Sequence, residues 1–116
     1  MLVLSLFDTL AKIKSMASIY HVCSAAAWQA AKEKGVYEHP SLASEGFIHC
    51  SDERQVAGVL MRYFNGQKNL LRLEIEPGKL SSELKWEDSP SLGEAFPHIY
   101  GPINIDAIVG IQELGN

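Results

Sequence analysis

Three of the four histidines stand in short apolar segments, each with a hydroxyl-bearing residue within three positions. These segments are IYHVCS around His21, GFIHCS around His49 and FPHIYGP around His98. Side chains at strand ends converge on clefts, so we expect the three imidazoles to line one polar pocket. Imidazole has an ordinary pKa of about 6.5 and can therefore donate, accept or carry a proton near neutral pH.

Hydroxyl groups beside these histidines extend the chemistry of the predicted pocket. Ser24, Ser51 and Tyr100 each add a hydrogen-bond donor and acceptor lone pairs. Ser51 is also predicted to begin a helix, whose first backbone N–H groups suit an anionic ligand. The sequence therefore predicts a phosphorylated or carboxylated small molecule as the ligand. His39 stands beside Pro40 in a predicted loop and is interpreted as a surface residue.

Two other chemistries use the same residue types. Covalent catalysis by Cys50 or Ser51 is disfavoured, because neighbouring strand residues point to opposite faces and His49 cannot activate the adjacent thiol. Metal binding by His21, His49 and His98 stays open as an alternative, although their spacing matches no familiar zinc pattern.

The elements that must position these residues alternate between short strands and helices. A helix is predicted at 25–34, between the N-cap Ser24 and Gly35, and a second at 52–63, capped by Ser51. Strands are expected at 19–23, 46–50, 70–75, 84–87 and 105–114, with an edge or bent strand at 96–103 because of its prolines. Predicted loops cover 36–45 and 89–96. Helices early and strands late favour an α+β fold with a mostly antiparallel sheet.

The first seventeen residues are predicted to be separate from the rest. Apolar residues at helical spacing predict an appended amphipathic helix, and they are Val3, Leu6, Phe7 and Leu10. A second interpretation is that translation begins at Met16. The apolar stretch is far shorter than the roughly 20 residues of a membrane span and follows no basic residue, so it predicts neither an anchor nor a signal peptide. We expect an extension at 1–17 and one globular domain at 18–116.

Composition limits the function classes. The 116 residues are 47% apolar and 21% charged, which is typical of one folded domain. The net charge of −4, with no run of like charges, disfavours nucleic acid as a partner. The only two cysteines, Cys23 and Cys50, form no framework pattern and favour a reducing cytoplasm.

Longer strings resemble a known family. The strings IYHVCS, PSLASEGFIHCS, LLRLEIEPGKL, LKWE and FPHIYGPI follow one another in this order between about 18 and 114. They closely resemble the bacterial domain-of-unknown-function family numbered 952. That family is distantly similar to the ADP-ribosyltransferase superfamily, which includes poly(ADP-ribose) polymerases and tRNA 2′-phosphotransferases. The resemblance implies an ADP-ribosyltransferase-like split, mostly antiparallel sheet with two helices, and NAD as substrate or ligand.

The resemblance also implies residue roles. His21 would hold a ribose hydroxyl of NAD, His49 and Ser51 would line the nicotinamide side of the cleft, and His98 or Tyr100 would stand near the catalytic glutamate of the transferases. The predicted catalytic residues are His98, His49 and Tyr100, and the predicted ligand-binding residues are His21, Ser24, Ser41, Ser51 and Glu87. No carboxylate occupies the FPHIYGP string, where such enzymes carry that glutamate.

Three hypotheses follow. The leading one is a small cytoplasmic protein that binds or acts on NAD or a related nucleotide by ADP-ribosyl- or phosphoryl-transfer-like chemistry. The missing glutamate weakens the ADP-ribosyl-transfer version. The acidic net charge weakens the phosphoryl-transfer version, whose substrate would be phosphorylated RNA. The second hypothesis is a non-catalytic module that recognises a small anion, a nucleotide or a protein partner. The third is a metal protein with histidine ligands.

Overall fold

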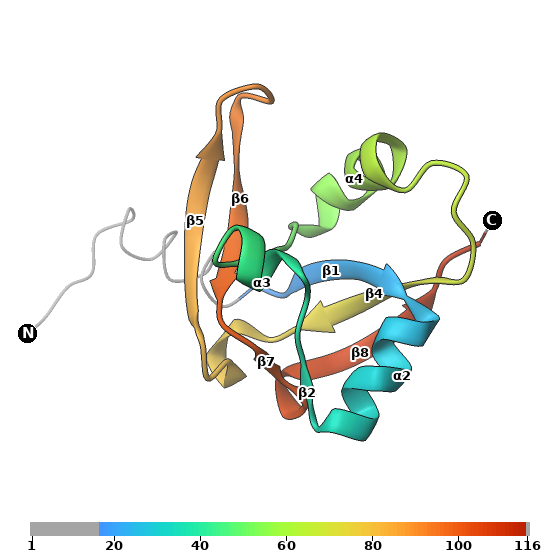
Figure 1. Ribbon diagram of the computed structural model, residues 1–116. Helices are drawn as coiled ribbons and strands as arrows, with labels where there is room; N and C mark the ends of the chain where they lie inside the picture. Colours follow the sequence, from blue (N-terminus) through green and yellow to red (C-terminus); the bar gives the residue numbers. More distant parts are fainter. Residues whose placement is uncertain (1–16, 116) are drawn as a thin grey trace, which may run out of the picture.

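The computed structural model describes residues 17–115, which form an α+β protein with two main helices (Figure 1). Its described strands make three small sheets, in the orders β1-β4-β8, β2-β7 and β3-β6-β5, and every pairing is antiparallel. The strands are β1 (Ile19–Ser24), β2 (Val36–Tyr37), β3 (Ile48–His49), β4 (Leu70–Ile75), β5 (Glu83–Ser89), β6 (Glu94–Tyr100), β7 (Ile103–Asn104) and β8 (Ile108–Glu113). The helices are α2 (Ala25–Lys34), α3 (Ser41–Ser44) and α4 (Val56–Tyr63), with 3-10 turns at Glu53–Gln55, Pro77–Lys79 and Ile105–Ala107. The predicted α+β class with a mostly antiparallel arrangement is confirmed.

The β1–α2 unit forms as its local signals predict. The Ser24 hydroxyl accepts a hydrogen bond from the N–H of Ala27 at 3.0 Å, and so caps the helix. Gly35 ends α2 in the left-handed region, with φ at 89°, where a side chain would be strained. The buried face of α2, Trp28 and Ala31, packs on the core.

The start of the second helix differs from the prediction. Asp52 is the cap: its carboxylate accepts from the N–H of Gln55, and the Gln55 side chain accepts from the N–H of Asp52. Ser51 instead exchanges two backbone hydrogen bonds with Tyr20, at 2.7 and 2.8 Å. The prediction that Ser51 offers helix N–H groups to an anion is therefore wrong, because its own N–H is bonded and the Asp52 carboxylate occupies the helix start.

Other predicted boundaries also change, among them that of the last strand, which begins at Ile108 after a 3-10 turn at Ile105–Ala107. The predicted loop at 36–45 contains β2, paired with β7, and the short helix α3, which begins directly after Pro40 because proline fits a first helical turn. The predicted strand at 46–50 is reduced to Ile48–His49. The loop at 89–96 is shorter, since β5 and β6 form a hairpin that continues to Ser89 and Glu94.

The segment predicted as an edge strand is central. β6 lies between β3 and β5, and Pro97 is fully buried within it. The carbonyl of Pro97 accepts from the N–H of Cys50 at 3.0 Å. Because the N and C=O of a strand residue point to the same neighbour, the missing proline donor faces the end of β3, where β3 stops at His49. Pairing with β5 is therefore undisturbed.

Packing on both faces of β1 buries the segment that carries His21. One face joins the main core, which includes Ile19, Leu73 and Ile99. The other face, with Tyr20 and Val22, packs against α4. A strand buried on both sides carries a continuous apolar run, which explains the IYHVC string.

The helix predicted within residues 1–17 lies outside the described residues, apart from Ala17. Between residues 17 and 115, no helix combines the length and apolar character needed to cross a membrane.

Candidate functional site

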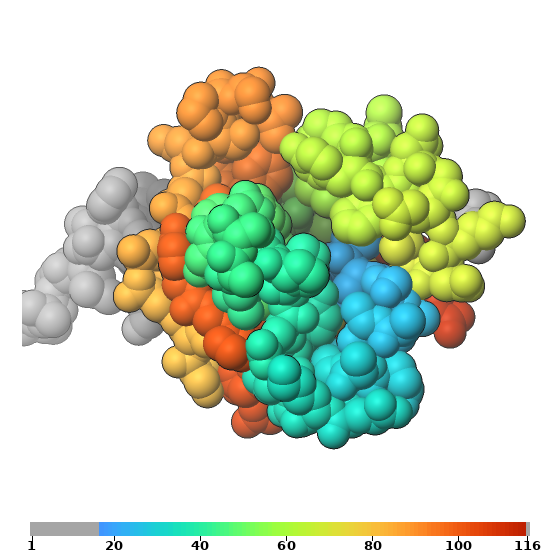
Figure 2. All heavy atoms as spheres, viewed as in Figure 1, coloured from blue at the N-terminus to red at the C-terminus, as the bar shows by residue number. Residues whose placement is uncertain are grey.

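A cleft of about 590 Å³ lies between α4, the α3 segment and the tip of the β5–β6 hairpin. In Figure 1 the hairpin and α4 rise on either side of β1, and Figure 2 shows the surface hollowed between them. All four histidines line this cleft, namely His21, His39, His49 and His98. The structure thus brings together the three histidine segments that lie far apart in the sequence, and it adds a fourth imidazole.

His98 is oriented by a carboxylate from the neighbouring strand. Its Nδ1 donates to Oε1 of Glu87 at 2.9 Å, and the hydroxyl of Tyr100 donates to the same oxygen. These two hydrogen bonds, that from Tyr100 first, hold the pKa of Glu87 below its ordinary value, and Glu87 raises the pKa of Tyr100 in return. With its proton on Nδ1, neutral His98 carries a free lone pair on Nε2.

An aromatic ring fixes the position of two imidazoles. Phe47 stacks on His98, with ring centroids 4.0 Å apart and an interplanar angle of 17°. The same ring lies 4.8 Å from that of His49, and the His49 and His98 centroids are 5.3 Å apart. The register of β3 on β6 sets this proximity, because His49 and His98 are direct cross-strand partners.

A second carboxylate contacts His49. Nε2 of His49 lies 2.9 Å from Oε2 of Glu45, and both side chains are about half exposed. Each of the two paired histidines of β3 and β6 therefore has its own carboxylate, Glu45 for His49 and Glu87 for His98.

His21 is a fully bonded, buried imidazole. Its Nδ1 donates to the carbonyl of His49 at 2.7 Å, and its Nε2 accepts from the hydroxyl of Tyr37 at 2.7 Å. Burial lowers the pKa of His21 to about 4, so the ring is neutral at pH 7. Both nitrogens are thus engaged within the protein, which leaves neither for the ribose hydroxyl that the resemblance implied.

His39 is the cleft residue that the sequence analysis placed at the surface. The backbone N–H of Ser41 donates to Nδ1 of His39 at 3.0 Å, and the His39 ring lies edge-on to His21 at 5.6 Å. The sequence signal that could have placed His39 in the cleft was the His-Pro-Ser spacing, because proline starts a helical turn that brings the serine back to the histidine.

Arg62 of α4 also lines the cleft, although such a helix residue is usually solvated.

The remaining predicted residues divide into three groups. Ser51 is buried and lines the cleft, whereas Tyr100 and Glu87 do not line it and are joined to each other, and through Glu87 to His98, by hydrogen bonds. Two serines serve the fold: the Ser24 hydroxyl caps α2, and the buried Ser41 hydroxyl donates to the carbonyl of Phe47 at 2.7 Å.

Of the two thiols, Cys50 lines the cleft and Cys23 does not. Cys23 and Cys50 are both free and buried. Burial raises the pKa of Cys23 to about 11 and raises that of Cys50 still further. Neither is therefore a thiolate near neutral pH, which agrees with the expectation against covalent catalysis.

The metal alternative finds no ligand set in the described part of the chain. Between residues 17 and 115, no three His, Cys, Asp or Glu side chains are arranged to hold a metal ion.

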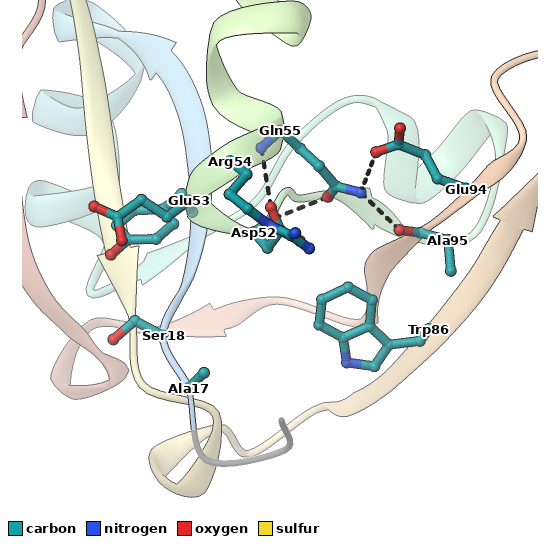
Figure 3. A pocket seen from close by; sticks show the side chains of 10 residues that line it. Ala17, Ser18, Asp52, Glu53, Arg54, Gln55, Trp86, Glu94 and Ala95 are labelled. Atoms are coloured by element: carbon teal, nitrogen blue, oxygen red, sulfur yellow. Dashed lines mark hydrogen bonds and ion pairs between the residues drawn. The ribbon is translucent and has the colours of Figure 1, made fainter. Parts of the chain in front are cut away.

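A second cavity of about 830 Å³ lies on the other side of Tyr20, and its wall includes Trp86 and Gln55 (Figure 3). The Gln55 amide donates to Glu94 at 2.6 Å and to the carbonyl of Ala95 at 2.8 Å. The charged residues that line this second cavity are Asp52, Glu53, Glu94 and Arg54, so carboxylates predominate in it. Its lining contains no histidine, and we therefore place the candidate site in the smaller cleft, which all four histidines line.

Comparisons with known proteins agree on the family. The model of the family described as "Protein of unknown function (DUF952)" matches residues 22–111, and the chain belongs to this family. Protein CC0527 from Caulobacter crescentus is similar: its X-ray structure is 36% identical, with a TM-score of 0.78 over 85% of this chain and 87% of that chain. Its solution NMR structure is 37% identical, with a TM-score of 0.72 over 84% of each chain. No curated protein matches the chain.

Proposed function

We propose that this member of the DUF952 family binds NAD or a related nucleotide in the histidine-lined cleft and acts on it by ADP-ribosyl-transfer-like chemistry. The observation that carries the proposal is the convergence of four imidazoles on one cleft, with His98 oriented by the carboxylate of Glu87. Carboxylate-oriented imidazoles that present a free nitrogen to a cleft are typical general bases.

The lining of the cleft supports a dinucleotide as the ligand. Its volume of about 590 Å³ is in the range of small-molecule sites. It presents aromatic rings, of Tyr63, Phe64 and Phe96, on which a base or nicotinamide ring can stack. It also presents one guanidinium and two carboxylates, those of Arg62, Glu45 and Asp88. NAD combines an anionic pyrophosphate with a cationic nicotinamide ring, so a lining of both signs is complementary to it.

The proposed reaction uses the free nitrogen of His98. An acceptor hydroxyl attacks C1′ of the ribose while its proton passes to Nε2 of His98. The bond between C1′ and nicotinamide breaks, and its electron pair leaves with nicotinamide, which departs uncharged. The imidazolium formed on His98 is then stabilised by Glu87, and Tyr100 holds Glu87 in place.

Glu87 also bears on the missing glutamate of the FPHIYGP string. The α+β fold with split antiparallel sheets supports an ADP-ribosyltransferase-like arrangement, in which a carboxylate stands on a late strand. Here we propose that β5 supplies, through Glu87, the carboxylate that the FPHIYGP string lacks. The free thiols Cys23 and Cys50 support a reducing cytoplasm as the compartment.

A second candidate is a binding module without catalysis. It is favoured by His21, whose nitrogens are both engaged, and by Glu87, which contacts His98 but does not line the cleft. Such a module predicts ligand affinity that survives His98→Ala, with no turnover to lose.

Calorimetric titration with NAD, ADP-ribose and nicotinamide, together with an assay of nicotinamide release, tests the proposal. We expect NAD to bind and to be cleaved, and His98→Ala to lower the turnover by about 10²–10⁴-fold, as for loss of a general base. Binding without any turnover would establish the binding module instead. If none of the three compounds binds and no nicotinamide is released, both forms of the proposal are overturned.

A further inference from the structure

His39 and Glu45 flank the short helix α3 and both line the cleft. We infer that these two side chains form a subsite for the vicinal diol of a ribose, with His39 as the donor and Glu45 as the acceptor. The inference rests on the proposed nucleotide function, which it extends to the recognition of one sugar.

The backbone of Ser41 favours a proton on the outer nitrogen of His39. Nδ1 lies 3.0 Å from the backbone N of Ser41, which donates to it, and 2.8 Å from the hydroxyl oxygen of the same residue. With Nδ1 accepting the backbone N–H, the proton of the neutral ring lies on Nε2. Within residues 17–115, Nε2 has no hydrogen-bond partner. Burial and the nearby His49 lower the pKa of His39, and Glu45 only partly opposes them. The lowered pKa keeps the ring neutral near pH 7. His39 therefore offers the cleft a single N–H donor.

Glu45 offers the complementary acceptor. Its Oε2 accepts from Nε2 of His49 at 2.9 Å, which orients the carboxylate and leaves Oε1 with free lone pairs. A carboxylate accepts hydrogen bonds from ribose hydroxyls well, and dinucleotide sites in other folds commonly use an acidic residue for this contact. A diol needs both an acceptor for its O–H groups and a donor for its oxygens, and this pair supplies both.

The segment that carries the pair is held rigidly. The buried Ser41 hydroxyl donates to the carbonyl of Phe47, which ties the start of α3 to the strand beyond it. Gly46, with φ at 89°, closes α3 by donating to the carbonyls of Ser41 and Leu42. Preorganised groups lose less entropy when a ligand binds, so a subsite on this segment would discriminate strongly.

His21 is excluded from the same role by its contacts. Both of its nitrogens are bonded inside the protein, to Tyr37 and to the carbonyl of His49. The His39 ring lies edge-on to His21, with ring centroids 5.6 Å apart, and is the more exposed of the two.

The test compares ribose with deoxyribose. Titrations use NAD and its two analogues that lack the 2′-hydroxyl of either ribose, and ribose 5-phosphate with its 2-deoxy counterpart. We expect the wild type to bind at least one deoxy compound about tenfold more weakly than its ribose parent. His39→Phe, which keeps a ring but loses the donor, should reduce the difference within each ribose and deoxy pair, and His39→Gln, which keeps an N–H donor, should restore part of it.

Glu45→Gln tests the acceptor, with Glu38→Gln as the matched control outside the cleft. Circular dichroism and thermal unfolding establish that each variant is folded. The inference is overturned if the wild type binds each ribose and deoxy pair with equal affinity, or if His39→Phe leaves the difference unchanged. Absence of NAD binding would instead count against the proposed function. The ribose 5-phosphate pair still decides the subsite in that case: if neither ribose 5-phosphate nor its 2-deoxy counterpart binds, the inference of a ribose subsite is overturned.

Discussion

Nδ1 of His98 lies 2.9 Å from Oε1 of Glu87, although the two residues sit on different strands. Glu87 also accepts the hydroxyl hydrogen of Tyr100, and the two bonds favour its ionised form. The consequence is that Nδ1 of His98 carries a proton, and in the neutral form of the ring Nε2 is the nitrogen with the free lone pair. The chemistry of the cleft therefore depends on a residue that does not itself line it.

Glu87→Gln should change the protonation of His98. The amide can present its NH₂ group to Nδ1, which would move the imidazole proton to Nε2 and remove the base. We expect turnover of NAD to fall by at least about 10²-fold while affinity changes little. Long-range ¹H–¹⁵N spectra of the imidazole check the tautomer directly. Glu83→Gln, on the same face of β5, is the matched control and should change neither quantity; equal losses in both variants would contradict the assignment.

Arg62→Ala should weaken nucleotide binding. Arg62 is the guanidinium of the cleft, and a phosphate loses its charge-assisted partner when this side chain is removed. We expect the Kd for NAD to rise about tenfold, corresponding to a lost charged hydrogen bond. Arg54→Ala removes the same charge from an exposed position on the second cavity and should leave the Kd unchanged. The prediction fails if the two variants weaken binding equally.

His21 should make stability depend on pH. Its folded pKa of about 4 lies below the ordinary 6.5, so the unfolded chain binds the proton more readily between these values. The contribution of neutral His21 to the free energy of unfolding is fully present above about pH 6.5. It is lost as the pH is lowered towards 4, by on the order of 3 kcal/mol. Urea unfolding at several pH values measures this slope. His21→Gln should flatten it, whereas His49→Gln at an exposed position should not; an unchanged slope in His21→Gln would contradict the assignment.

Tyr37→Phe should destabilise the fold. The substitution removes the hydroxyl that donates to Nε2 of His21 at 2.7 Å and leaves that buried nitrogen without a donor. The cost is about 1–3 kcal/mol of the free energy of unfolding, as for other buried unsatisfied groups. Tyr63→Phe, on an exposed ring, should change it by less than about 0.5 kcal/mol. Denaturant titration of both variants decides the matter, and similar values for the two would refute the role of the hydroxyl.

Local signals predicted the elements whose ends they mark. Helix α2 has the predicted bounds because Ser24 and Gly35 are strong caps, and β4 has the bounds predicted for the strand at Leu70–Ile75. Ser51 misled the prediction because it resembles a cap, while its backbone is used in pairing with Tyr20. The sequence contains no local trace of that pairing, since Tyr20 and Ser51 meet only in the folded chain.

In the candidate site, too, local signals could be predicted from the sequence, whereas contacts that form only in the folded chain could not. The order of the three histidine segments led to a common pocket, because strand ends converge. His39 was missed since its place in the cleft depends on the turn at Pro40 and on its contact with Ser41. Glu87 was named from its segment, but its contact with His98 depends on the register of β5 on β6, which short sequence patterns do not specify.

The central claim, that the histidine-lined cleft binds a nucleotide, is tested most directly by ¹H–¹⁵N correlation spectra recorded during titration with NAD. The cleft and the second cavity share Tyr20, but their other walls differ and can be distinguished residue by residue. The account predicts saturable shifts at His39, His49, Arg62 and Leu92, with little change at Arg54 and Trp86. Shifts confined to Arg54 and Trp86, or no shifts at millimolar NAD, would contradict it.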